Sequence, residues 1–133
     1  MDPSQVSWLA VTAAAASTFV LGGLWYSPLL FGKAWQRLVG LSDDDLRKRV
    51  AVTFAGAAAC AVIGATNLAF FLGPDPSIGF GVAAGAAAGI GWIATALTTT
   101  FLFERRPGAL IAIDVGYHAV AYAAMGAILG AWP

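Results

Sequence analysis

Four long apolar stretches, separated by short polar breaks, limit what this 133-residue chain can fold into more than any other feature. None of them contains Lys or Arg, and each is near or above the ~20 residues that a helix needs to cross a bilayer. The sequence therefore predicts an all-α integral membrane protein, an antiparallel four-transmembrane-helix bundle that forms one membrane domain over residues 1–133. The expected spans are Val6–Tyr26, Val50–Leu72, Ile78–Phe103 and Ala109–Trp132.

The composition excludes other classes of protein. Hydrophobic residues make up 59% of the chain and charged residues only 11%, whereas soluble domains are ~45–50% apolar and ~25% charged. The seven basic and seven acidic residues cancel, so no overall field is available to attract nucleic acid, and no nucleic-acid partner is expected. The single cysteine, Cys60, excludes an intramolecular disulfide and a multi-cysteine metal cluster. The sequence requires no cofactor and indicates no metal site.

The positive charges predict an orientation. All seven Lys and Arg residues fall in two loops, residues 32–49 and 104–108. Because basic loops stay on the cytoplasmic side, both loops are expected there, with both termini outside. The expected location is a bacterial inner membrane, whose lipid bilayer is then the first partner. The first span lacks the basic start of a signal peptide, so it is expected to remain in the mature protein.

The first basic loop is expected to hold helices of its own. Ser27 and Pro28 suit a helix start, and the mixed apolar and polar residues up to Val39 predict a short interfacial helix over residues 28–39. Gly40 is expected to end it.

Ser42 then predicts the start of the second long helix, with three aspartates in its first turn. These aspartates are spaced for i,i+4 pairs: Asp43 with Arg47, Asp44 with Lys48 and Asp45 with Arg49. Two interpretations remain open, a solvated helix start that sets the topology and a binding surface for a cytoplasmic partner.

Glycines at intervals of four predict where helices pack. Span three carries Gly81, Gly85 and Gly89 as two overlapping GxxxG motifs, and span four carries Gly126 and Gly130. Helices in lipid associate where small residues allow close approach. These ridges are expected to be contact surfaces, either within one chain or between copies. A homo-oligomer or a subunit of a larger complex is expected.

Two ionisable residues at membrane depth mark the candidate site. Asp114 and His118 are four residues apart on span four, and Tyr117 and Tyr122 continue the same region. Intramembrane charges are costly and commonly functional. Three interpretations stay open: a hydrogen-bonded structural clasp between Asp114 and His118, a site for a ligand, ion or proton, and chemistry.

Depth counting along the spans predicts the neighbours of that pair. Thr18, Cys60 and Thr95 are expected near the level of His118, while Gly22, Gly23 and Thr98 are expected near Asp114. A small polar pocket inside the bundle should result, opening towards the cytoplasm and covered there by aromatic residues. The expected cover is Trp25, Tyr26 and Trp92.

Two blocks of sequence resemble a known family. Residues 22–35, which read Gly-Gly-Leu-Trp-Tyr-Ser-Pro at their start, resemble its opening signature, and residues 114–118 with 125–130 resemble its closing one. The family is catalogued as a domain of unknown function, number 1761. The resemblance covers essentially the whole chain and implies a similar size, four spans, and that the block from Trp25 to Trp35 belongs with the Asp114–His118 pair. It implies no activity.

Three functions fit these observations. The first is a structural or accessory subunit, or a self-associating helical bundle, that packs through its glycines. The alternative is a small oligomeric transporter or channel that uses Asp114 and His118 for a proton, ion or small ligand. The third, ranked last, is an enzyme or a lipid or cofactor binder using His118, Tyr117, Tyr122 and Cys60. No catalytic residue is assigned.

Overall fold

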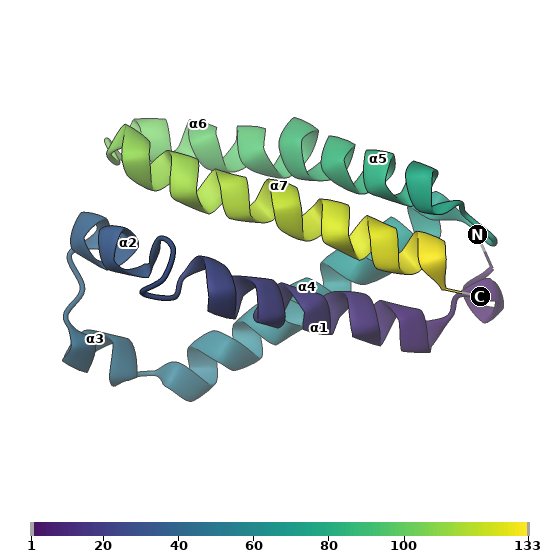
Figure 1. Cartoon of the computed structure of the whole chain (residues 1–133), viewed down its shortest axis with the longest axis horizontal. Helices are drawn as coiled ribbons and strands as arrows, with labels where there is room; N and C mark the ends of the chain where they lie inside the picture. Colours follow the sequence, from purple (N-terminus) through teal and green to yellow (C-terminus); the bar gives the residue numbers. More distant parts are fainter. Residues whose placement is uncertain (1, 133) are drawn as a thin grey trace.

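The computed structural model describes residues 2–132, and every regular element in that range is helical, as the sequence predicts. Four segments are long and apolar enough to cross a membrane. A short 3₁₀ helix, η1 (Pro3–Gln5), precedes the first of them. The four segments are α1 (Trp8–Trp25), α4 (Val50–Leu72), the continuous run of α5 (Ile78–Ala88), η2 (Gly89–Ala94) and α6 (Thr95–Phe103), and α7 (Gly108–Ala131) (Figure 1).

Serine side chains set where α1 and α5 begin. The hydroxyl of Ser7 accepts a hydrogen bond from the backbone N–H of Ala10 at 3.3 Å. The hydroxyl of Ser77 accepts one from Phe80 at 3.2 Å. Each bond satisfies a donor that the first helical turn leaves free. Both helix starts lie at the end of the molecule that holds the chain termini, which we call the terminal end (Figure 1).

The hydrophobic core lies in the terminal half of the molecule. Small residues of α1 meet α4 and α7 there, and Ala14 and Ala65 have no exposed surface. Because alanine side chains are short, the three helix backbones approach closely. The buried core residues are Ala10, Val11, Ala14, Ala15, Ala65, Leu68, Ala69, Leu72, Met125 and Leu129.

Glycines allow α5 and α7 to pack at backbone distance. A Cβ added at Gly81 would collide with the carbonyl oxygen of Gly126, and one at Gly85 would collide with that of Tyr122. A Cβ at Gly89 would lie 3.0 Å from the carbonyl oxygen of His118. Residue numbers therefore rise along α5 as those of their partners fall along α7. The glycine ridge is used inside the chain, where Gly81, Gly85 and Gly89 are buried.

The third segment is interrupted by a π-helix, where the sequence predicts a regular helix over residues 78–103. The interruption spans η2, Gly89–Ala94. The hydroxyl of Thr95 donates to the carbonyl oxygens of Gly91 at 2.8 Å and Trp92 at 3.0 Å. Hydroxyl side chains satisfy backbone groups that such local adjustments free in apolar surroundings. Thr95 therefore supports its own helix.

The interfacial helix is shorter than predicted. It begins at Gly32, not at Pro28, and runs to Val39 as α2. Residues 26–31 form a turn instead, in which the N–H of Phe31 donates to the carbonyl of Trp25 at 3.0 Å. The hydroxyl of Ser27 donates back to Leu24 at 2.7 Å and so does not cap a helix. The expected end at Gly40 is confirmed, with a left-handed φ of 74°.

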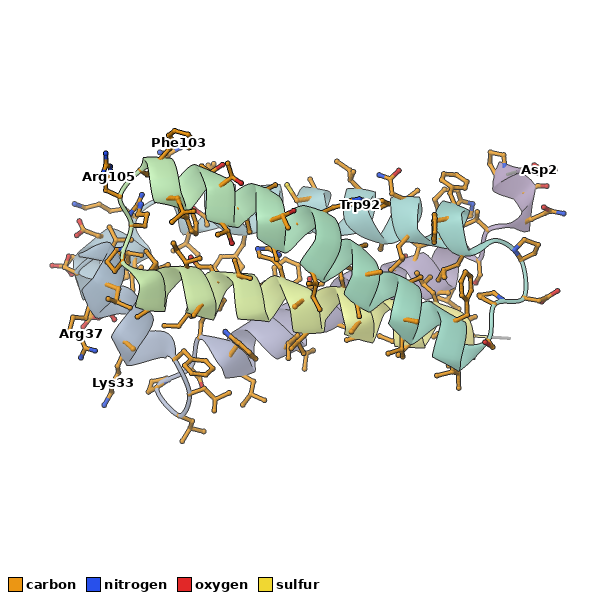
Figure 2. The ribbon with its side chains drawn as sticks, turned by 90° about the horizontal axis from the view of Figure 1, so that it is seen from above. Asp2, Lys33, Arg37, Trp92, Phe103 and Arg105 are labelled. Carbon is orange, nitrogen blue, oxygen red and sulfur yellow. The ribbon has the colours of Figure 1, made fainter. Side chains whose placement is uncertain are left out.

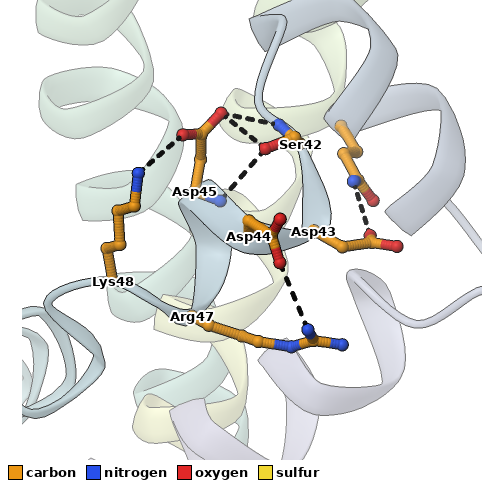
Figure 3. Close-up of polar contacts among 7 residues, drawn as sticks. Ser42, Asp43, Asp44, Asp45, Arg47 and Lys48 are labelled. Atoms are coloured by element: carbon orange, nitrogen blue, oxygen red, sulfur yellow. Dashed lines mark hydrogen bonds and ion pairs between the residues drawn. The ribbon is translucent and has the colours of Figure 1, made fainter.

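The acidic turn forms a separate helix, so the prediction that Ser42 starts the second span is wrong. Helix α3 (Asp43–Arg47) ends before an extended Lys48 and a left-handed Arg49 with φ of 59°. The break allows α4 to change direction at Val50. The ion pairs are therefore i,i+3 and not i,i+4. Figure 3 shows Asp44 with Arg47 at 3.3 Å and Asp45 with Lys48 at 3.7 Å.

Candidate functional site: a cavity between three helices

A cavity of about 460 Å³ lies between α1, α4 and α7, in the half of the molecule away from the termini. It exists because α4 leans away from its neighbours. In Figure 1 the end of α4 next to α3 lies apart from α7, and residues 50–57 are all exposed. We call this half the open half and the half that holds the core the closed half.

The cavity wall combines apolar surface with a few polar groups. No Asp, Glu, Lys or Arg is among its lining residues. The polar side chains are Thr18 and Tyr26 from α1 and its end, Cys60 from α4, and Tyr117, His118 and Tyr122 from α7. The remaining lining residues are Phe19, Gly22, Gly23, Phe54, Ala57, Ala61, Ala121 and Met125.

Two tyrosines of α7 reach across to different helices. The hydroxyl of Tyr117 donates to the backbone carbonyl of Thr18 at 2.9 Å and so binds α1. Tyr122 extends to α4, where a Cβ on Gly64 would lie 2.5 Å from its hydroxyl oxygen. Because Gly64 has no side chain, the phenol fits against the α4 backbone. Tyr122 packs against the core and closes the cavity towards the closed half.

His118 lies between these tyrosines with free hydrogen-bonding groups. Its ring packs edge-on against Tyr117, with ring centroids 5.0 Å apart. Within residues 2–132, the His118 imidazole, the Tyr122 hydroxyl and the Cys60 thiol all make no hydrogen bond. A neutral imidazole donates from one nitrogen and accepts at the other, and a phenol can donate. The cavity therefore presents polar groups without protein partners.

Asp114 is bound by α1 and not by His118. The hydroxyl of Tyr26 donates to its Oδ1 at 2.8 Å, and one residue earlier the indole N–H of Trp25 donates to the carbonyl of Ile113 at 3.0 Å. The expected hydrogen bond between Asp114 and His118 does not form among residues 2–132, because the carboxylate turns to Tyr26. A polar clasp exists, but it joins the end of α1 to α7.

The structure brings some predicted pocket residues together and leaves others outside. Thr18 and Cys60 line the cavity with His118, in agreement with their predicted depth. Gly22 and Gly23, which are expected near Asp114, line the same cavity although Asp114 does not. Tyr26 lines it as well, and its ring packs edge-on against Trp35 of α2 at 5.6 Å.

Asp114 and four other predicted residues are outside the cavity lining. Thr95 and Thr98 belong to α6 and do not contribute to the wall. Trp92 is 70% exposed and does not contribute to the wall. Trp25 is not in the lining either, because its ring packs over Gly116, where a Cβ would meet it at 3.1 Å.

Sequence reasoning missed two contacts around the cavity: the pair of phenylalanines at its mouth, and the contact of Tyr122 with Gly64 at the end next to the core. Phe19 of α1 stacks with Phe54 of α4 at 6.1 Å between centroids. Both residues read as ordinary apolar positions in their spans, so nothing in the sequence singles them out. The contact of Gly64 with Tyr122 depends on how two helices are rotated, which spacing alone does not reveal.

A metal site is not formed by the part of the chain that the structure describes: residues 2–132 contain no group of three or more His, Cys, Asp or Glu able to hold an ion. His118 and Cys60 are the cavity residues with ligating atoms, and structural zinc sites use four ligands.

These features define a class: a small all-helical protein with four helices long and apolar enough to cross a membrane, and a neutral cavity between three of them. The chain belongs to the family described as protein of unknown function (DUF1761), whose family model matches residues 9–130. The match confirms the resemblance seen in the sequence. Comparison with curated proteins gave no significant match, and neither did comparison with solved structures.

Proposed function

We propose that the chain is an antiparallel four-helix membrane protein with its basic end in the cytoplasm. Lys33, Arg37 and Arg105 lie at one end of the molecule and Asp2 at the other (Figure 2). The remaining basic residues are in the same two loops, and positive loops are retained on the cytoplasmic side. A bacterial inner membrane suits this asymmetry.

Within that membrane the protein binds a small lipid-soluble molecule in the cavity between α1, α4 and α7. One observation carries this function: His118 and Tyr122 line a cavity of about 460 Å³ without protein hydrogen-bond partners. Ligand sites have volumes of about 300–1,000 Å³ and combine apolar walls with a few polar groups. The mouth beside the exposed part of α4 gives access from the lipid.

Native mass spectrometry of gently extracted protein tests this proposal. The wild type should carry a reproducible small extra mass, and His118→Ala should lose it because the ligand loses its polar contact. Trp92→Ala is the matched control, since Trp92 is outside the cavity. Absence of any bound mass from the wild type, or equal retention by His118→Ala, would contradict the proposal.

Self-association, or a role as an accessory subunit, is the second candidate function. It is favoured by the exposed first half of α4, where Val52 and Phe54 are 62% and 57% exposed. The buried glycine ridge leaves this half of α4 as the more suitable contact surface. Gly56 lies on it, and a Cβ there would meet nothing within 4 Å.

The same mass measurement tests this second candidate. A homo-oligomer or a fixed partner should be present in the wild type and lost in Gly56→Leu, while the monomer stays folded because Gly56 has free space around it. Gly91→Leu is the control, since Gly91 is equally open but on η2. A monomeric wild type, or an assembly that Gly56→Leu leaves intact, would reject it.

A further inference from the structure

The chemistry of the cavity identifies a class of ligand, and this inference rests on the proposed function. The geometry points to an uncharged, planar ring compound of the quinone class, with carbonyl oxygens on the ring and an apolar tail in the lipid. Four properties of the cavity support this assignment: its charge, its hydrogen-bond donors, its aromatic walls and its opening.

Charge comes first, because it excludes the commonest lipids. The lining contains no residue with a fixed charge, so a phosphate, a carboxylate or an amine would be buried there without a counter-ion. Burying an unpaired charge away from water is very costly. Asp114 is the nearest carboxylate on α7, and Tyr26 already donates to it. A neutral ligand is therefore favoured over a phospholipid head group or a fatty acid.

The free polar groups are suited to acceptor oxygens. His118 offers an N–H and Tyr122 an O–H, and both lie on the cavity face of α7. Their backbone positions are four residues apart, which is about 6 Å along a helix axis. The Tyr122 hydroxyl extends across to Gly64 of α4 while the His118 ring packs beside Tyr117, so the two donors can serve two acceptor oxygens of one ligand. Tyr117 adds no third donor, because its hydroxyl donates to Thr18.

Aromatic side chains from all three helices favour a flat ring. Phe19 comes from α1, Phe54 from α4, and Tyr117 and Tyr122 from α7. Aromatic side chains pack against other planar rings by stacking or edge-on contact. An unbranched acyl chain would not gain from these faces.

The opening explains where a tail would go. Residues 50–57 of α4 are exposed along the mouth, and Phe19 and Phe54 stack at 6.1 Å across it. At about 460 Å³ the cavity holds a substituted ring and the first part of a side chain. The rest of a long apolar tail would extend between α4 and α7 into the surrounding lipid, on the side that the two stacked rings do not bridge.

Equilibrium binding of a decyl-substituted benzoquinone to the full chain in detergent tests the inference. Decylbenzene, which keeps the ring and tail but lacks the oxygens, is the comparison ligand. The quinone should bind at least 10-fold more tightly. Tyr122→Phe keeps the aromatic wall but removes one donor, so quinone affinity should fall about 10-fold, while decylbenzene affinity stays within twofold.

Thr99→Val is the control, because it removes a hydroxyl that bonds to the carbonyl of Thr95 within α6, outside the cavity; quinone affinity should stay within twofold. Equal affinity for both ligands, or no loss in Tyr122→Phe, would overturn the inference. If the quinone fails to displace the bound mass that His118→Ala loses, the ligand class is wrong and the binding site stands. If Ala57→Leu, which fills the cavity, leaves quinone binding unchanged, both proposals fail.

Discussion

The helices α1, α4 and α7 run through both the closed and the open half of this protein, but they are joined in different ways in the two halves. In the closed half the helices meet through alanines, and Ala14 and Ala65 are completely buried. In the open half α4 leans away, and α1 is joined to α7 by three hydrogen bonds. These come from Trp25, Tyr26 and Tyr117.

The difference shows how a small bundle can hold a cavity and remain stable. Close packing by small residues is the usual source of association between helices in lipid, and here it is concentrated at one end. Cavity volume follows the same division: the space at the terminal end measures about 110 Å³, against about 460 Å³ in the open half. Directional hydrogen bonds fix α1 against α7 where packing is incomplete.

The largest effect is expected from a variant that disrupts the contact between α5 and α7 in the closed half. Gly81→Leu places a side chain where the carbonyl of Gly126 lies, so the free energy of unfolding should fall by about 3 kcal/mol or more. Unfolding by sodium dodecyl sulfate in mixed micelles measures this loss. Gly79→Leu is the control on the same helix, because a Cβ at Gly79 would meet nothing within 4 Å. Equal losses in the two variants would contradict the packing.

A second pair of variants compares the two halves along α4. Ala65→Leu overpacks a fully buried position and should lower the free energy of unfolding by about 1–3 kcal/mol. Ala57→Leu extends into the cavity and should leave it nearly unchanged. The same micelle titration measures both. The division into halves would be wrong if Ala57→Leu destabilised the protein as much as Ala65→Leu.

A smaller effect is expected at the hydrogen bonds of the open half. Tyr26→Phe removes the donor to Asp114, and the free energy of unfolding should fall by about 0.6–2 kcal/mol, as for a polar contact between helices in lipid. Tyr122→Phe is the control, because its hydroxyl makes no hydrogen bond within residues 2–132. A loss in Tyr122→Phe that matches the loss in Tyr26→Phe would show that the polar contact does not join α1 to α7.

The smallest effect concerns exposed carboxylates at the two ends. Hydrogen bonds from the backbone N–H and then the hydroxyl of Ser42 lower the pKa of Asp45 (Figure 3). The backbone N–H of Ser4 lowers the pKa of Asp2 in the same way. Each contact is therefore fully formed above the ordinary pKa of an aspartate and is lost as the pH falls through the lowered value.

Carboxyl NMR titration should place both midpoints below the ordinary range, and Ser42→Ala should return only Asp45 towards it. A shift in the pKa of Asp2 in Ser42→Ala would contradict the structure, which places the two carboxylates at opposite ends of the molecule.

The sequence predicts the parts of this fold that depend on local chemistry. Apolar length predicts the four long segments, and α4 has the expected bounds of Val50 and Leu72. Gly40 ends α2 as its backbone freedom predicts. Predictions fail where the local backbone conformation sets the start of a helix. The N–H of Phe31 bonds to Trp25 in the turn before α2, and Arg49 is left-handed just before α4.

The sequence predicts the depth at which the site residues lie along their helices, but not which side of each helix faces the cavity. Counting residues along each span places Thr18 and Cys60 beside His118 correctly. It also places Thr95 there, although Thr95 turns back to the carbonyls of its own helix. Which side of a helix faces inward depends on η2 and on the contacts of α5 with α7. Both are tertiary properties that spacing does not reveal.

The π-helix also acts as a one-residue insertion in the third segment. It keeps the small buried residues before and after it on the same side of the segment, where they form one stripe. The small buried positions recur every four residues through Gly81, Gly85 and Gly89, and the next buried residue is Ala94, five positions on. Removing one residue between positions 90 and 93 would convert the segment to a regular α-helix and leave the stripe aligned. A deletion before Gly85 would instead rotate part of it by about 100°. Changes of length in this span are therefore tolerable at one place and disruptive at another.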